Sequence, residues 1–235
     1  MHGVSHFSTA TRLIFSPPFP LQQFHEYFDH YFNFDSVFAD DTDEVNYQNQ
    51  LALERAGLEP IPVVHDVHRE EIKYYIDRGY RTIALGSTQN GNQKVLEYAF
   101  DQFSVAGVRV HLFGNVKFSS VANFPIWSCD TTAWAQRGKW GFIYYWNPHR
   151  KPADKTDKIY MDEYMDSSKK RDFYYSTYEY RNELDQYLYE ELKITSDDLY
   201  GSEGTYYKFL ANLHFYVKLE ELVTQIHQAK GFTIN

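Results

Sequence analysis

The sequence predicts a mixed α/β fold of the (β/α)8 barrel (TIM-barrel) type, incomplete or irregular at its N-terminus, with a helical C-terminal extension. Between residues 34 and 134, apolar runs of four to six residues alternate with helix-like segments of nine to fourteen residues. The apolar runs are mostly continuous, which is typical of parallel strands that are covered on both faces. Glycines follow several of the helical segments, at the position just past a helix end. An open, doubly wound sheet is the alternative.

The elements follow one another in the order that right-handed βαβ crossovers require. Strands are expected at residues 34–39, 61–64, 82–85, 108–113, 126–129 and 142–146. The intervening helices are expected at residues 45–56, 70–78, 93–106 and 117–123. Further upstream, residues 12–16 are a strand candidate and residues 21–32 an aromatic-rich helix candidate.

Composition divides the chain into a barrel-like domain, residues 1–150, and a helical C-terminal region, residues 151–235. The chain holds 21 tyrosines, and many of them lie after residue 159. Residues 151–158 are charged and contain Pro152, so they read as an exposed linker. Two long helices are expected at residues 171–192 and 206–229. Their aromatic side chains are expected to pack on the barrel or on each other; a face for a partner or for a homo-oligomer is the alternative.

The net charge, the cysteine count and the lengths of the apolar runs argue against several classes of protein. The formal net charge is −9, which argues against tight non-specific binding of nucleic acid, although a local basic patch or a nucleic-acid substrate is compatible with it. Cys129 is the single cysteine, so the sequence excludes an internal disulfide and a multi-cysteine zinc site. We found neither a signal-peptide pattern nor an apolar run of membrane-spanning length, and we expect a cytoplasmic protein without a membrane partner.

Polar and small residues follow the predicted strands. In parallel α/β folds, ligands bind at the carboxyl ends of the strands. The residues at these positions are Asp40, Asp41, His65, Asp66, Gly86, Ser87, Gly114, Asn115 and Asp130. Carboxylates there can accept hydrogen bonds from amino or amide groups, and glycines allow a close approach to the backbone.

Each of these residues also has a structural interpretation. Asp40 can serve the start of the following helix, His65 can pair with Asp66, and Gly86 can be a turn glycine. His111 lies within a strand, so it is either a satisfied core histidine or a residue that faces the barrel interior. Their common location at one rim favours a site, with Asp130 as its reactive group.

Searches for other chemistry found no phosphate-binding loop, no dinucleotide fingerprint and no nucleophile elbow. His65 and His68 could share a metal with Asp66, but no further ligand is specified. We therefore predict neither a metal nor a cofactor.

Two short motifs resemble a known family. They are V-H-L-F-G at residues 110–114 and S-C-D-T-T-A-W at residues 128–134. The pair resembles the tRNA-guanine transglycosylase superfamily, and especially its bacterial and phage members that place 7-deazaguanine bases in DNA. P-I-P-V-V-H at residues 60–65 and I-A-L-G at residues 83–86 fit the same subgroup. The similarity spans residues 37–134.

The resemblance implies base exchange on a TIM barrel. Asp130 would attack the anomeric carbon and form a covalent glycosyl–enzyme intermediate. Asp40 would hold the purine or 7-deazapurine base, Gly86 with Ser87 would supply backbone contacts, and His65, His111 and Gly114 would complete the base site. DNA or tRNA would carry the exchanged base.

The chain also departs from the family. The family's N-terminal Asp-Ser-Gly motif has no match before Phe34, and the zinc-binding cysteines of the tRNA enzymes are missing. Two other hypotheses therefore stay open. One is a catalytically inactive barrel that binds a base, a nucleotide or a partner, and the other is an unrelated hydrolase or lyase that uses the same acids.

Overall fold

The structure is a computed structural model, and it describes residues 24–33, 43–86, 91–161 and 173–232. The chain forms two compact units. The first unit comprises residues 1–131 together with residues 226–235, and the second comprises residues 132–225. The predicted boundary at residue 150 therefore differs from the division in the structure, which falls after residue 131.

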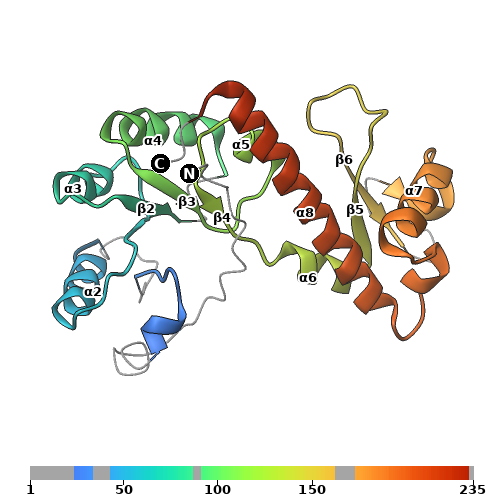
Figure 1. Cartoon of the computed structure of the whole chain (residues 1–235), viewed down its shortest axis with the longest axis horizontal. Helices are drawn as coiled ribbons and strands as arrows, with labels where there is room; N and C mark the ends of the chain where they lie inside the picture. Colours follow the sequence, from blue (N-terminus) through green and yellow to red (C-terminus); the bar gives the residue numbers. More distant parts are fainter. Residues whose placement is uncertain (1–23, 34–42, 87–90, 162–172, 233–235) are drawn as a thin grey trace. The chain divides into compact units, whose positions relative to one another are not determined.

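A four-stranded parallel sheet forms the centre of the first unit (Figure 1). Its strands are β1 (Val63–Val64), β2 (Thr82–Leu85), β3 (Arg109–Leu112) and β4 (Ser128–Cys129), in the order β1-β2-β3-β4. An isolated parallel bridge between Phe32 and Ile61 extends the pairing beyond β1. Because the order along the sheet is the order along the chain, the described strands show no reversal of the kind that defines a doubly wound sheet.

A helix precedes each strand of this sheet. These helices are α2 (Asp43–Arg55), α3 (Glu71–Asp77), α4 (Gln93–Ala106) and α5 (Phe118–Val121). Helix α4 shows why they form: the Asn92 side chain accepts a hydrogen bond from the Lys94 amide, and Gly107 ends the helix at φ 64°. Its buried residues are Leu96, Ala99, Phe100 and Phe103, the spacing of a helix with one apolar face.

The two faces of the sheet differ in what covers them. Crossovers between parallel strands are right-handed as a rule, which places consecutive connecting helices on one face, and α3 and α4 lie on the same side of β2 and β3 in Figure 1. On the other face, Ile61, Val63 and Ala84 form a cluster with the side chains of Phe32, Phe113 and Trp127. A mixed α/β fold with a parallel sheet is thus confirmed, while the described residues contain four strands of that sheet rather than a complete barrel.

A second sheet, of three strands, belongs to the second unit. β5 (Phe142–Trp146) pairs antiparallel with β6 (Thr156–Tyr160), which pairs parallel with β7 (Phe173–Tyr174). The other elements are α6 (Ala133–Lys139), η2 (Tyr175–Thr177), α7 (Arg181–Tyr187), the π-helix η3 (Leu188–Leu192), η4 (Ser196–Leu199) and α8 (Gly204–Lys230).

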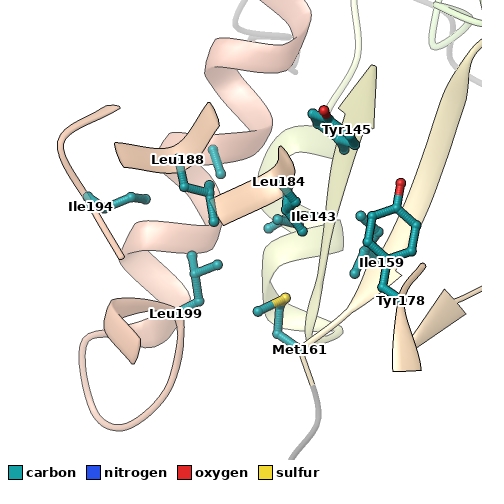
Figure 2. Close-up of a cluster of buried hydrophobic side chains, with 10 residues drawn as sticks. Ile143, Tyr145, Ile159, Met161, Tyr178, Leu184, Leu188, Ile194 and Leu199 are labelled. Carbon is teal, nitrogen blue, oxygen red and sulfur yellow. The ribbon is translucent and has the colours of Figure 1, made fainter. Parts of the chain in front are cut away.

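The core of the second unit lies between one face of this sheet and the helical segments that follow it (Figure 2). Ile143, Tyr145 and Ile159 come from the sheet. The helical side contributes Leu184, Leu188, Leu199 and Ala211, with Ile194 from the connecting segment. The expectation that C-terminal aromatic and leucine residues pack with each other holds for this cluster.

Several sequence-based expectations were wrong. Residues 142–146 form a strand, but it pairs antiparallel in the second sheet and is no barrel strand. The expected linker at residues 151–158 overlaps β6. Its charged residue Asp157 is buried, and the carboxylate accepts hydrogen bonds from Arg150, Asn147 and Tyr178. The expected helix at residues 171–192 contains β7, η2, α7 and η3 instead.

The N-terminal helix expected at residues 21–32 is also largely wrong. The described part has one short 3-10 helix, η1 (His25–Tyr27), and Phe32 then pairs as a strand residue with Ile61. The strands expected at residues 12–16 and 34–39 lie outside the described residues.

The last turn of α8 belongs to the first unit. The Nε2 atom of His227 lies 2.7 Å from the carbonyl oxygen of Val121, and the Nζ atom of Lys230 donates to the carbonyl oxygen of Ala122 at 2.8 Å. These contacts occupy carbonyls at the end of α5, where a helix leaves its last carbonyls unpaired. Across the described ranges, we find no helix with both the length and the apolar character needed to cross a membrane.

Candidate functional site

Four of the predicted site residues follow four neighbouring strands. His65 comes directly after β1, Gly86 after β2 and Asp130 after β4, and Gly114 is two residues past the end of β3. Because these strands are parallel and adjacent, the four residues lie at one edge of the sheet. Asp40 and Ser87, which were predicted to belong to the same site, lie outside the described residues.

Asp130 is held at this edge by the backbone of β3 and of the turn that follows β3. Its Oδ1 atom accepts a hydrogen bond from the Gly114 amide at 2.8 Å, and its own amide donates to the carbonyl oxygen of Leu112 at 3.2 Å. The Asp130 side chain is 19% exposed. A carboxylate that is oriented by an amide and still reaches solvent can act as a base or as a nucleophile.

The backbone of Gly114 explains how that amide reaches the carboxylate. Gly114 has φ 65°, in the left-handed region that other residues adopt at a cost. The turn after β3 thereby directs an N–H group towards the end of β4. The turn therefore favours a glycine at this position. The sequence had predicted a glycine here for another reason, the close approach of a ligand to the backbone.

His111 lies beneath the carboxylate and is 1% exposed. Its Nδ1 atom is 2.8 Å from Ser128 Oγ, and its Nε2 atom is 3.6 Å from Asp130 Oδ1. If the serine hydroxyl donates to Nδ1, a neutral ring carries its proton on Nε2, on the side of Asp130. Nε2 of His111 is buried and forms no hydrogen bond within the described residues, and its distance of 3.6 Å from Asp130 Oδ1 is longer than a hydrogen bond.

Two aromatic rings enclose the imidazole of His111. The ring centroids of Phe32 and Phe113 lie 4.5 Å and 4.7 Å from that of His111. Apolar neighbours lower the local dielectric, so a proton on Nε2 would be attracted more strongly to the carboxylate than it would be in water. The sequence identified His111, but it gave no sign of Ser128 as its partner, because a serine inside a strand has no characteristic pattern.

At the end of β1, Glu71 fixes the conformation of the chain. Glu71 is fully buried, and its Oε2 atom accepts hydrogen bonds from the amides of His65 at 2.6 Å and Asp66 at 2.8 Å. Its Oε1 atom lies 3.7 Å from Nδ1 of His65. Sequence reasoning missed Glu71; its one visible signal is its position in the first turn of α3, where a carboxylate is favoured.

Asn33 and Asn46 are further buried residues that the sequence analysis missed. Asn33 Nδ2 donates to the Asn46 carbonyl oxygen at 2.9 Å, and Asn46 Nδ2 is 3.4 Å from Nδ1 of His65. Within the described residues, Asn33 Oδ1, Asn46 Oδ1 and Glu71 Oε1 are buried and accept no hydrogen bond. Buried oxygens of this kind favour a neighbouring N–H or O–H donor.

Gly86 lies close to the end of β1. Its amide donates to the carbonyl oxygen of Val64 at 2.8 Å, and a Cβ atom at Gly86 would lie 3.2 Å from the same oxygen. The absence of a side chain thus allows the backbones of two strand ends to approach closely.

The metal hypothesis for His65, His68 and Asp66 receives no support from the described residues. They contain no group of three or more His, Cys, Asp or Glu side chains that could hold a metal ion. Asp66 instead accepts a hydrogen bond from the His68 amide at 2.9 Å and lies 3.4 Å from Arg69 Nε.

No protein-family model, no curated protein and no solved structure matches this chain.

Proposed function

We propose that the protein is a transglycosylase of the tRNA-guanine transglycosylase type, which exchanges a guanine or 7-deazaguanine base in nucleic acid. One observation carries this proposal: Asp130 is a partly exposed carboxylate at a strand end, with Oδ1 oriented by the Gly114 amide and His111 at 3.6 Å. The motifs at residues 110–114 and 128–134, which carry the family resemblance, are the segments that build this arrangement.

Asp130 acts as the nucleophile in this scheme. With Oδ1 engaged by Gly114, Oδ2 attacks the anomeric carbon while the bond from that carbon to the base nitrogen breaks, and the departing base takes a proton from water. An incoming base then attacks the glycosyl ester through its ring nitrogen, gives the proton of that nitrogen to water and releases the carboxylate. The Nε2–H group of His111 steadies the negative charge on Asp130 before attack and after release.

The base is held at the ends of β1 and β2. Gly86 permits a flat ring to approach the backbone, and His65 supplies an imidazole beside it. The buried oxygens of Asn33, Asn46 and Glu71 make this region rich in acceptors, which suits the amino and ring N–H groups of a guanine-like base. Asp40 and Ser87 keep their proposed roles in base binding.

The four-stranded sheet is proposed to be a segment of a (β/α)8 barrel. Sequential strand order and a polar rim at the carboxyl ends support this interpretation over a doubly wound sheet.

Covalent trapping tests the proposal. The full chain is incubated with a 7-deazaguanine base and either a DNA oligonucleotide or a tRNA transcript, and adducts are detected by denaturing electrophoresis and mass spectrometry. We expect an adduct on Asp130 that Asp130→Asn abolishes, because an amide is a poor nucleophile. Asp66→Asn changes another strand-end carboxylate and should leave the adduct intact. An adduct that persists in Asp130→Asn would rule out this nucleophile.

A second candidate function is base binding without catalysis. It is favoured by the number of parallel strands in the described sheet, which is four, half of a complete barrel. Calorimetric binding of the 7-deazaguanine base to the wild-type chain, without any adduct under the same conditions, would support this candidate over the enzyme.

A further inference from the structure

Glu71 is a buried carboxylate that has one ion-pair partner within the described residues. The side chain is fully buried, and Oε2 accepts hydrogen bonds from the amides of His65 and Asp66. Oε1 accepts none, and it lies 3.7 Å from Nδ1 of His65, a distance that suits an ion pair but exceeds a hydrogen bond. A lone charge in a dry interior is strongly unfavourable, so this carboxylate requires a positive group beside it.

One proton can neutralise this pair, and its place on either partner has different consequences. A proton on Glu71 would make the carboxyl group neutral. The two amides that donate to Oε2 oppose that state, because hydrogen bonds to a carboxylate favour its charged form. A proton on Nδ1 of His65 instead forms an imidazolium next to Oε1. The contacts therefore favour a charged pair of Glu71 carboxylate and His65 imidazolium.

Asn46 supplies a second reason for a proton on Nδ1. Its Nδ2 atom lies 3.4 Å from Nδ1 of His65, and its Oδ1 atom is buried and accepts no hydrogen bond within the described residues. An asparagine amide can turn by 180° without a change of shape, which exchanges these two atoms. After that turn, Oδ1 of Asn46 and Oε1 of Glu71 both face the N–H group of an imidazolium. A neutral ring with its proton on Nε2 leaves both oxygens without a donor.

The neighbouring titratable groups of the described residues leave this balance unchanged. Asp66, which follows His65 in the chain, has its carboxylate 3.4 Å from Nε of Arg69, so its charge is compensated. Tyr75 lies one helical turn after Glu71, and burial raises the pKa of its hydroxyl, so it stays neutral. Glu71 and His65 therefore balance each other's charge.

We propose that Glu71 keeps His65 in its imidazolium form, and that this cation donates a hydrogen bond to the carbonyl oxygen of a guanine-like base. The inference rests on the proposed base exchange and names a specificity-determining residue of that base site. An imidazolium carries a proton on both ring nitrogens, so one N–H group faces Glu71 while the other serves the base. The buried Oδ1 of Asn33 can bind N–H groups of such a base but not its carbonyl oxygen, which requires a donor.

Nitrogen-15 NMR of the imidazole rings measures the protonation state of His65 without any ligand. The full chain is labelled with ¹⁵N-histidine, and the signals that disappear in His65→Gln assign this residue. We expect both ring nitrogens of His65 to carry a proton at pH 7. Glu71→Gln should convert the ring to its neutral form at the same pH, because the amide has no charge. Asp77→Asn, which removes an exposed carboxylate of the same helix, is the control and should leave His65 unchanged.

Calorimetric binding of two free bases to the full chain tests the specificity. The bases are 7-deazaguanine and its analogue with hydrogen in place of the carbonyl oxygen. We expect the wild type to prefer 7-deazaguanine by roughly tenfold or more, the range for a hydrogen bond to a charged group. In Glu71→Gln the preference should fall to a few-fold, as for a neutral donor, and in His65→Leu to within about twofold of unity.

Two results overturn the inference: a neutral His65 at pH 7 in the wild type, or the same base preference in the wild type and in Glu71→Gln. Circular dichroism checks the fold of each variant. If Glu71→Gln does not fold, the wild-type NMR spectrum and the preference of His65→Leu decide the question. If 7-deazaguanine does not bind the wild type at all, both the base site and this inference are rejected. Covalent trapping on Asp130 together with a neutral His65 would count against this inference alone.

Discussion

Asp130 and His111 illustrate how single residues define the candidate site. A strand-end aspartate is common in parallel sheets, and its chemistry depends on what touches it. Here one oxygen is bound by the Gly114 amide, and the imidazole of His111 is anchored on its far side by Ser128. A histidine held in this way keeps one ring nitrogen turned towards the carboxylate. Asp130 is thus positioned by β3 and the turn after it, while Ser128 of β4 contacts His111 rather than Asp130.

Gly114→Ala tests the turn that orients Asp130. An alanine at φ 65° is strained, so we expect the free energy of unfolding to fall by about 1–2 kcal/mol. Covalent trapping should fall as well, because the shifted amide no longer orients Oδ1. Urea unfolding followed by circular dichroism measures the first effect.

Gly91→Ala is the control for that substitution. Gly91 has nothing within 4 Å of an added Cβ atom, and its φ lies outside the left-handed region. The free energy of unfolding of this variant should stay within about 0.5 kcal/mol of the parent value. Equal effects of the two substitutions would show that the turn at Gly114 carries no special strain.

At the level of elements, the second unit depends on one apolar cluster between its sheet and its helices. Leu184 of α7 is fully buried in that cluster. We expect Leu184→Ala to lower the free energy of unfolding by about 2–5 kcal/mol, because truncation removes apolar contacts and leaves a cavity. Leu213→Ala, at a residue of α8 that is 40% exposed, should cost much less. Comparable losses in both variants would contradict this assignment of the core.

The sequence predicts the first sheet well because each of its elements carries a local signal. Thr82–Leu85 is an apolar run, and Gln93–Ala106 has a helical apolar face and ends at Gly107. The sequence alone therefore predicts which residues follow these strands and share the carboxyl edge of the sheet. Asp130, His65, Gly86 and Gly114 were predicted by this reasoning, and the structure places them at one edge.

The second unit was predicted poorly because its signals are not local. The strand β6 contains Thr156, Asp157 and Lys158, a polar run that is typical of an exposed linker. It can be part of a sheet because Arg150 pairs with the buried Asp157, and that pairing cannot be predicted from local sequence. The same holds for Asn33 and Asn46 of the first unit, which carry no local signal. Their role is visible only from the hydrogen bond between them, which joins residues thirteen positions apart in the chain. Pairings of this kind depend on tertiary structure, which overrides local propensity.

At the scale of the whole molecule, the fold lowers the pKa values of several histidines, of which His227 is buried. Burial lowers the pKa of His227 below its ordinary value of 6.5; the Val121 carbonyl opposes this effect and Lys230 adds to it. Burial likewise lowers the pKa values of His30 and His214. Below about pH 6.5 the unfolded chain therefore binds more protons than the folded chain, and the stability of the fold decreases as the pH falls.

His227→Gln tests this pH dependence. A glutamine amide can still donate to the Val121 carbonyl, but it does not titrate. We expect the variant to lose less stability than the wild type between about pH 7.5 and pH 5.5, as measured by urea unfolding at each pH. Identical pH profiles for the two proteins would mean that His227 does not contribute.

The contacts of His227 and Lys230 with α5 also bear on the order in which the protein is made. The first unit is discontinuous in the chain: residues 132–225 are translated between α5 and the turn of α8 that binds its carbonyls. At ordinary elongation rates this interval is roughly 5–20 s. During that time the nascent first unit has the strand ends and Asp130, but its α5 carbonyls await their partners. The candidate site can thus reach its final stability only after the second unit has left the ribosome.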